Sequence, residues 1–375
     1  MVTSGRRLAS VLFLLLVNGL QAFGQNVPCW SRSRLDSLAV AATGQIDSVF
    51  NNDQSIMAWG LPDYLRAVSR DVSTSGDPQA YARIRRYLSR IVNATDRARG
   101  VKDFTGESRV VWGTFRNSTD STKRIVLLVE TARLASALVE GAQALTKRFG
   151  PDTLTRKAVA TAKAALRSYD GEWREAGDSL GWYVEPDGMT VQYAGVGKPW
   201  PVNMEALAGL ALWEVGTANG DSLLLRRARM IYRAVVRTVL GSVRQDGHWD
   251  YWADAPASYP HHPDDVGHAS FTAEFLAFGR IFEPSRWGEV KAVVERNFAN
   301  FYPDSLESTE RIGTRFAGRM GTDLRRWVEW APLSTHVRRV VLSFAGSPAL
   351  WPNPETYLFC SSIAYFHIEP EQRQP

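Results

Sequence analysis

Two adjoining segments decide the fold: NMEALAGLALWEV (203–215) and SLLLRRARMIYRAVVRTV (222–239), joined by Asn219-Gly220-Asp221. The first segment is apolar on nearly every helical face, which is typical of a helix buried on all sides. The second has an apolar face and a stripe of arginines, which predicts a helix with one side toward water. The Gly-Asp turn between them predicts an antiparallel hairpin of one inner and one outer helix.

The same alternation recurs along the chain. We expect inner helices at 124–145, 266–282 and 356–367, with a less regular one at 324–330, and outer helices at 151–169 and 284–301. Further helices are expected near 34–50, 54–71 and 78–96, and strand patterns are sparse. Repeated helical hairpins predict an all-α repeat architecture, either an open superhelix or a closed (α/α) toroid, complete or incomplete.

The two cysteines, Cys29 and Cys360, lie near opposite ends of the chain. A disulfide between them would join the first and last elements, which favours a closed ring; two buried free thiols are the alternative. The ring is also favoured by long aromatic loops, because such loops need a shared cavity on which to converge.

The first residues predict export. Arg6 and Arg7 precede an apolar run and the small residues of Ala22-Phe23-Gly24, the pattern of a secretory signal peptide over 1–24. We expect residues 25–375 to form one domain without a membrane span, secreted or periplasmic. The net charge of +5 is spread along helices rather than gathered in a patch, so nucleic acid is not an expected partner.

The stretch from Arg244 to Phe275, RQDGHWDYWADAPASYPHHPDDVGHASFTAEF, contains four of the six histidines of the chain. It is too aromatic for an ordinary solvated loop and too polar for core. Such a mixture is typical of a concave site that stacks on apolar faces and exchanges protons at polar edges.

Three short motifs carry a resemblance: PWPVNMEALAG (199–209), WDYW (249–252) and DDVGHA (264–269). Over about 80 residues the chain resembles the (α/α) toroid carbohydrate-active enzymes, including members that act on uronic-acid polymers as lyases and glucuronyl epimerases. The resemblance implies a toroid whose cleft accepts a polysaccharide. It does not fix the reaction, because this fold hosts several chemistries.

Asp265 and His268 lie three residues apart, on one face of the first turn of a helix that begins near Asp264. A carboxylate beside an imidazole holds its tautomer and raises its basicity, as a general base requires. We expect one of Asp264 and Asp265 to cap the helix and the other to partner His268. The neighbouring histidines are ligand-type residues, but their spacing matches no established zinc motif, and we expect neither a metal nor another cofactor.

Three more polar residues belong to apolar inner segments. Asn203 and Glu205 open the helix after Trp200, where they either serve the helix terminus or face the cleft. Glu130 lies among apolar residues, so it needs a buried partner, a polar cavity or an exposed position. Further substrate contacts are expected from Glu130 and, in the loops, from Tyr193, Trp200, Arg244, Trp249, Trp252 and His261.

Together these features predict a polysaccharide lyase acting on a uronic-acid-containing, anionic glycan by β-elimination. Asn203 with Arg244 would neutralise the substrate carboxylate, while His268 and a tyrosine, Tyr251 or Tyr193, would move the protons. The alternatives are a glycoside hydrolase that uses two carboxylates, from Glu130, Glu205, Asp250 and Asp265, and a glycan-binding protein without catalysis.

Overall fold

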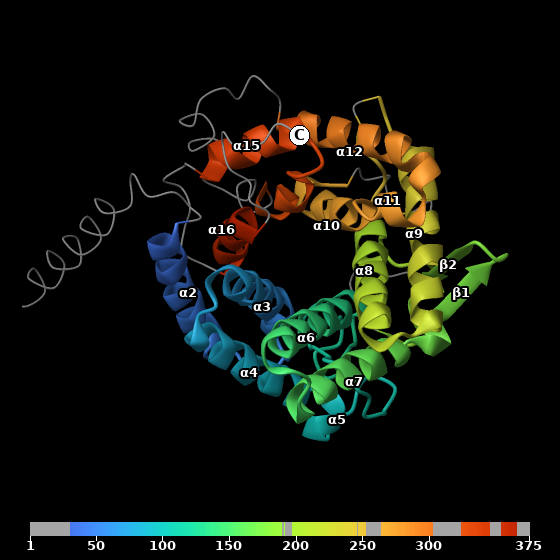
Figure 1. The fold of residues 1–375 in the computed structure, drawn as a ribbon. Coiled ribbons are helices and arrows are strands. Elements are labelled where there is room, and N and C mark those ends of the chain that lie inside the picture. The colour runs from blue at the N-terminus through green and yellow to red at the C-terminus, as the bar shows by residue number, and fades with distance from the viewer. Residues whose placement is uncertain are drawn as a thin grey trace, which may run out of the picture.

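The computed structural model describes residues 31–189, 191, 197–245, 247–252, 264–302, 324–345 and 354–365. Its helices form a closed double ring (Figure 1). The inner ring consists of α3 (Ile56–Ser75), α6 (Leu128–Phe149), α8 (Val202–Asn219), α10 (Val266–Leu276), η3 (Arg325–Trp330) and α16 (Pro354–Tyr365). The outer ring consists of α2 (Arg32–Ile46), α4 (Pro78–Asn93), α7 (Thr153–Arg167), α9 (Ser222–Ser242), α12 (Trp287–Phe301) and α15 (Thr335–Ala345).

The ring closes where α16 packs against both α3 and α2. This arrangement confirms the predicted (α/α) toroid and excludes the open superhelix. Cys360 is buried in α16 and is disulfide-bonded, whereas Cys29 lies outside the described residues.

Local sequence explains where the helices begin and end. The side chain of Asp221 accepts hydrogen bonds from the first backbone N–H groups of α9, and Asp152 forms a capping box with Thr155 at α7. Gly76 and Gly220 end α3 and α8 in the left-handed conformation that glycine adopts without steric cost. These caps keep the inner-to-outer turns short.

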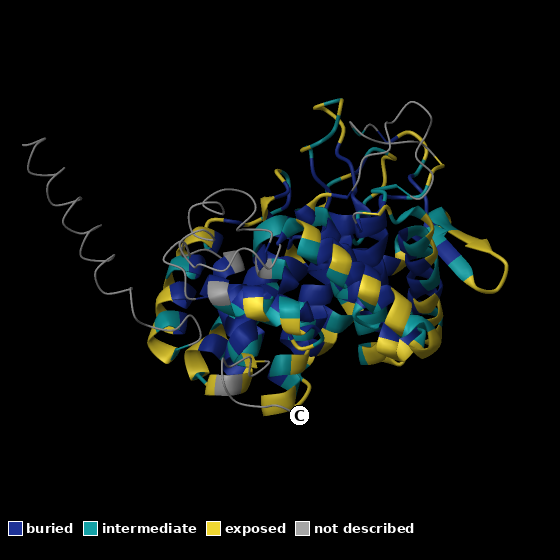
Figure 2. Ribbon diagram, turned by 90° about the horizontal axis from the view of Figure 1, so that it is seen from above, coloured by how far each residue is buried: buried dark blue, intermediate teal, exposed yellow. Residues whose placement is uncertain are grey.

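Where the structure describes them, the connections from outer to inner helices are longer than the turns from inner to outer helices, and they lie together on one side of the ring (Figure 2). They include α5 (Asp96–Arg99), η1 (Asp170–Glu172) and an antiparallel hairpin of β1 (Trp173–Ala176) and β2 (Leu180–Tyr183). We call this side the rim. Every inner helix starts at the rim, so the first turns of all of them face the same end of the ring axis.

Two predicted helix boundaries were wrong. The predicted inner helix 266–282 is interrupted after Leu276 and continues as α11 (Gly279–Phe282), followed by η2 (Pro284–Arg286). The segment 124–127 is not helical, because Ile125 pairs with Thr114 in an isolated β-bridge. Among the described residues, no helix is long and apolar enough to cross a membrane.

Candidate active site

The inner helices present columns of side chains toward the ring axis. On α3 the column consists of Trp59, Asp63, Arg66 and Arg70. Their spacing of three or four residues places them on one face of the helix. The last three pair with residues of other inner segments, which places this face toward the axis. The corresponding column of α8 is Asn203, Leu207, Leu210 and Glu214.

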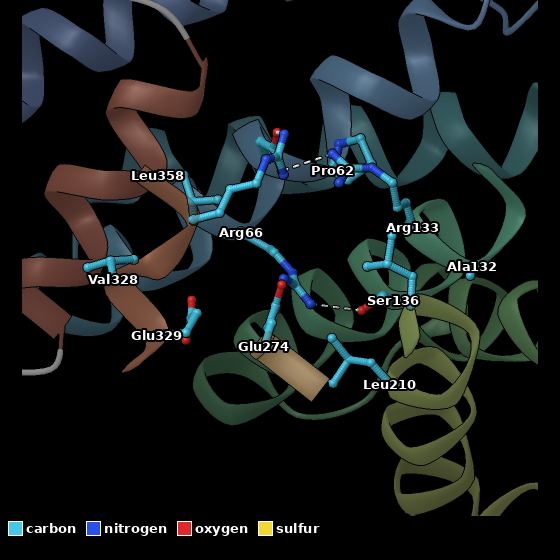
Figure 3. Close-up of a pocket in the computed structure, with 13 residues that line it drawn as sticks. Pro62, Arg66, Ala132, Arg133, Ser136, Leu210, Glu274, Val328, Glu329 and Leu358 are labelled. Carbon is cyan, nitrogen blue, oxygen red and sulfur yellow. Dashed lines mark hydrogen bonds and ion pairs between the residues drawn. The ribbon is translucent and has the colours of Figure 1, made fainter. Parts of the chain in front are cut away.

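The end of the axis away from the rim is closed by ion pairs. Arg66 contacts Glu274 at 2.5 Å, Glu140 at 3.1 Å and Glu214 at 3.3 Å, and its guanidinium lies between Glu274 and Ser136 in Figure 3. Burial raises the pKa of Glu214 to about 7, although Arg66 opposes the shift. These side chains fill the axis, and a cavity of about 20 Å³ beside them has room for roughly one water molecule.

Nearer the rim, aromatic and arginine side chains meet across the axis. Trp59 of α3 and Phe271 of α10 approach to 6.2 Å between ring centroids, although their helices lie on opposite sides of the ring (Figure 1). The guanidinium of Arg133 lies 4.9 Å from the Trp59 ring and 5.2 Å from the Phe271 ring. Arg326 of η3 covers Phe271 at 4.3 Å. We call these four residues the floor, because they separate the rim side of the axis from the ion pairs.

His268 lies one turn above the floor, three residues before Phe271 on α10. Its Nδ1 is 2.8 Å from Oδ2 of Asp265, and the ring of Tyr251 meets the imidazole edge-on at 5.0 Å. The His268 side chain is 34% exposed. The predicted histidine–aspartate pair is therefore present, and it lies on the rim side of the floor.

Asp265 fills both predicted roles. Its side chain accepts hydrogen bonds from the backbone N–H groups of Gly267 and His268, so it caps α10 while it also contacts the imidazole. Burial alone would raise the pKa of Asp265, but the hydrogen bonds from His268 and Gly267 outweigh it and hold the pKa at about 2. The carboxylate is thus ionised at neutral pH.

The predicted division of roles between the two aspartates was wrong. Asp264 is 1% exposed and accepts a 2.9 Å hydrogen bond from the indole N–H of Trp249. Its backbone N–H donates to the Trp249 carbonyl at 2.8 Å, so the two residues close the base of the loop between them. Burial raises the pKa of Asp264 to about 7. Asp264 thus holds Trp249 against the start of α10.

Asn203 and Glu205, predicted as catalytic, separate in space. Asn203 belongs to the axial column, and its Oδ1 is buried without a hydrogen-bond partner among the described residues. Glu205, two residues later, faces away from the axis and accepts the backbone N–H of Tyr183 in β2 at 2.9 Å. Burial raises the pKa of Glu205 well above its usual range. The prediction for Glu205 was therefore wrong. Its side chain lies on the side of α8 away from the axis and binds β2, which belongs to the rim.

Glu130, predicted to bind substrate, is fully buried behind the floor. Its carboxylate accepts hydrogen bonds from Asn52 at 2.6 Å and from the indole N–H of Trp59 at 3.3 Å. Burial raises the pKa of Glu130, and these hydrogen bonds oppose the shift. The structure thus makes Glu130 a support for Trp59 rather than a substrate contact.

Two predicted stacking residues belong to the core. Trp200 is 2% exposed and Trp249 is fully buried, so neither ring has a free face for a sugar. Trp252 is half-buried and packs edge-on against Tyr251 at 5.6 Å. Arg244, predicted to neutralise a substrate carboxylate, forms a 3.0 Å ion pair with Asp250 at an exposed position.

Two other predicted residues, Tyr193 and His261, lie outside the described residues. Within the described ranges, no group of three or more His, Cys, Asp or Glu side chains is placed to hold a metal ion.

The sequence interpretation missed the floor. Trp59 and Arg133 lie in helices that were predicted, and Arg326 lies in the less regular segment 324–330. The available signal was the column on α3, where an aromatic and three charged residues recur on one face of a helix that also carries apolar residues. Reading that face as axial requires knowing that α3 is an inner helix.

Comparison with known proteins supports the fold. No protein-family model and no curated protein sequence matches the chain. A solved structure of D-mannose isomerase superposes with a TM-score of 0.51 at 11% identity, covering 86% of this chain and 87% of the isomerase. An unsaturated glucuronyl hydrolase from Bacillus sp. GL1 gives a TM-score of 0.34 at 14% identity, covering 72% of this chain and 84% of the hydrolase. The toroid fold is therefore shared with D-mannose isomerase.

Proposed function

We propose that the protein is a carbohydrate-active enzyme that removes a C–H proton from a sugar, with His268 as the base. The observation that carries the proposal is the 2.8 Å contact between His268 Nδ1 and Asp265 on the rim side of the floor. A neutral imidazole that donates from Nδ1 to a carboxylate has its lone pair on Nε2. The arrangement therefore supplies an oriented base in the region where the inner helices begin.

The reaction we propose is β-elimination on a uronic-acid-containing glycan, as in a polysaccharide lyase. Nε2 of His268 would take the proton from C5, and the electron pair of that bond would form a double bond between C5 and C4. The bond from C4 to the glycosidic oxygen would break, and that oxygen would take a proton from an acid. Tyr251 is the proposed acid, because its ring already contacts the imidazole.

Isomerisation of a free sugar is the second candidate. It is favoured by the fold shared with D-mannose isomerase, and moving hydrogen between adjacent sugar carbons requires a similar oriented base. The two-carboxylate hydrolase gains little support from the four carboxylates considered. Glu130 and Glu205 are buried on different inner helices, Asp250 pairs with Arg244, and Asp265 caps α10.

The test is a product screen with glucuronan, alginate and glycosaminoglycans. Elimination creates an unsaturated uronate that absorbs in the ultraviolet, so we expect absorbance to rise with wild-type protein and not with His268→Ala. New reducing ends without absorbance would contradict elimination and indicate hydrolysis. Conversion of mannose without activity on the polymers would indicate isomerisation, and binding without any product would indicate a glycan-binding protein.

We also propose that the protein is exported. The support is the signal-peptide pattern of residues 1–24, which lie outside the described residues. Expression of the full chain, followed by N-terminal sequencing of the secreted fraction, should give a mature chain that starts at Gln25. A protein that stays in the cytoplasm with Met1 or Val2 at its terminus would contradict export.

A further inference from the structure

The side-chain amide of Asn203 is buried without a structural role. Asn203 is 2% exposed, its Oδ1 is buried, and its side chain forms a hydrogen bond with no described residue. It does not cap a helix either, because it is the second residue of α8 and the N-cap position is Pro201. A buried polar group without a partner costs free energy, so native proteins seldom keep one that has no function.

The other residues of its column show where the Asn203 side chain points. Leu207 and Leu210 line the small axial cavity, as Figure 3 shows for Leu210, and Glu214 contacts Arg66 on the axis. Their spacing of three or four residues places all of them on one face of α8. Asn203 is one turn closer to the rim than Leu207 and does not line that cavity. It therefore faces the axis on the rim side.

Asn203 and His268 lie at nearly the same height on neighbouring inner helices. A Cβ atom on Gly209 of α8 would lie 2.4 Å from the Phe275 ring of α10, so these two residues are level with each other. Both helices begin at the rim and run parallel. Asn203 precedes Gly209 by six residues, a rise of about 9 Å. His268 precedes Phe275 by seven residues, a rise of about 10.5 Å.

Tyr251 connects the two positions. Its backbone carbonyl accepts a 2.9 Å hydrogen bond from the N–H of Val202, the residue before Asn203, and its ring meets His268 edge-on at 5.0 Å. Solvent reaches this end of the axis, since the His268 side chain is 34% exposed and Tyr251 is half-buried. A sugar placed against His268 would therefore lie close to the Asn203 amide.

The chemistry of the amide selects the group that it can bind. An amide has N–H donors at one end and an acceptor oxygen at the other. A carboxylate only accepts hydrogen bonds, so it would leave Oδ1 of Asn203 unpaired. A hydroxyl group both donates and accepts, and one hydroxyl or two adjacent ones can satisfy both ends of the amide.

We propose that Asn203 is a specificity-determining residue that binds hydroxyl groups of the sugar ring on which His268 acts. The proposal rests on the proposed function of His268, and it replaces the carboxylate-binding role predicted for Asn203. Because the amide is buried, a sugar without the matching hydroxyl would leave it unpaired. A site of this kind discriminates strongly against analogues that lack the hydroxyl.

The experiment is a thermodynamic cycle between the amide and single hydroxyl groups. The ligands are methyl β-D-glucuronide and its 2-deoxy and 3-deoxy analogues, which each lack one ring hydroxyl that a 4-linked uronate leaves free. Dissociation constants are measured by NMR titration of the full chain. With the wild type, removing at least one of these hydroxyls should weaken binding roughly 3- to 10-fold, the value of one hydrogen bond. With Asn203→Leu, the same removal should have no effect.

Asn219→Leu is the matched control, because it makes the same substitution at the exposed end of α8 away from the rim. It should keep the wild-type differences between the three ligands. Thermal denaturation gives a second measurement. Asn203→Leu removes an amide that has no partner among the described residues, so the midpoint of unfolding should not fall. If Asn203→Leu does not fold, Asn203→Ala is used for the same ligand comparison.

Three results would overturn the proposal. They are an equal loss of affinity for all three ligands in the Asn203 variant, which would indicate a structural role, unchanged differences between the ligands in that variant, and a wild type that does not distinguish the ligands or binds none. Failure of the proposed function gives a different result. His268→Ala would then form the wild-type product in the glycan screen, whatever the ligand comparison shows.

Discussion

The same inner helices carry two polar regions of different character. Away from the rim, Arg66 contacts three carboxylates and the hydroxyl of Ser136, and its side chain is 12% exposed. On the rim side, His268 is 34% exposed and Asp265 is 53% exposed. The first region is a closed set of charges that joins four helices, whereas the second is an oriented pair open to solvent.

Under the proposed function, the first region serves stability and the second serves catalysis. A buried charge network is costly to disturb, because removing one member leaves the others buried and unpaired. A half-exposed pair at a helix start can be altered with little effect on the fold, since water can replace its contacts. Substitutions in the two regions should therefore give opposite combinations of stability and activity.

The largest effect is expected from Arg66→Ala. This change leaves Glu140, Glu214 and Glu274 without their shared cation, and the free energy of unfolding should fall by about 3–5 kcal/mol. Urea denaturation monitored by circular dichroism measures the loss. A variant with wild-type stability would show that the network contributes little, and the distinction between the two regions would fail.

The second effect concerns Asp264 and has a defined pH range. Its folded-state pKa of about 7 exceeds the value of about 3.9 in unfolded chains. Between these values the folded state holds a proton that the unfolded state has lost, so stability falls as pH rises from about 4 to about 7. The loss amounts to at most about 4 kcal/mol.

Asp264→Asn should remove this contribution while its side-chain oxygen still accepts the Trp249 indole N–H. Urea unfolding at pH 5 and pH 8 should therefore show a smaller decrease for the variant than for the wild type. Equal decreases in the two proteins would contradict a neutral, buried Asp264 in the folded state.

The sequence predicted the ring well and the site in part. Inner helices were recognisable because segments such as 203–215 are apolar on all faces, and the turns after them contain glycine or aspartate. The pair of Asp265 and His268 was recognisable because both partners lie within one helical turn. Local spacing was sufficient for these features.

The floor was not predictable in the same way. Trp59 and Phe271 meet across the axis although 212 positions separate them in the chain, and no local pattern indicates such a contact. Glu205 and Trp200 were predicted to be functional from their residue types alone, and the structure contradicts both predictions. Their residue types suit a sugar site, but helix geometry turns Glu205 away from the axis, and packing buries the Trp200 ring.

A moderate effect on activity is expected from Asp265→Asn. Asparagine is also a good N-cap, so stability should change by less than about 1 kcal/mol. The amide cannot stabilise an imidazolium as the carboxylate does, and kcat should fall roughly 10- to 100-fold. Steady-state kinetics and thermal denaturation of the same sample check both expectations, and unchanged kcat would contradict the role of the pair.

The pH profile of the wild type sharpens this point. Because the pKa of Asp265 is about 2, below the value of about 3.9 in unfolded chains, the stability that its ionised form contributes is lost only as pH falls from about 4 toward 2. Protonation of Asp265 therefore accounts for no change in activity between pH 7 and pH 5.

The smallest effect is expected from Arg286→Ala, which removes an exposed ion pair with Glu289. Such pairs contribute about 0–1 kcal/mol, so both stability and activity should stay near the wild-type values. It is the control for Arg66→Ala, because each variant removes one arginine. A loss as large as that of Arg66→Ala would mean that burial does not distinguish the two ion pairs.

The central claim is that His268 removes a C–H proton from a sugar. Its most direct test is solvent exchange, in which wild-type protein and His268→Ala are incubated with glucuronan, oligoglucuronate or mannose in D₂O and followed by NMR. With the wild type we predict that deuterium replaces hydrogen at a carbon beside the carboxylate or carbonyl, or that elimination removes the C5 hydrogen. Neither change is expected with His268→Ala. Equal reaction with a folded His268→Ala would contradict the claim.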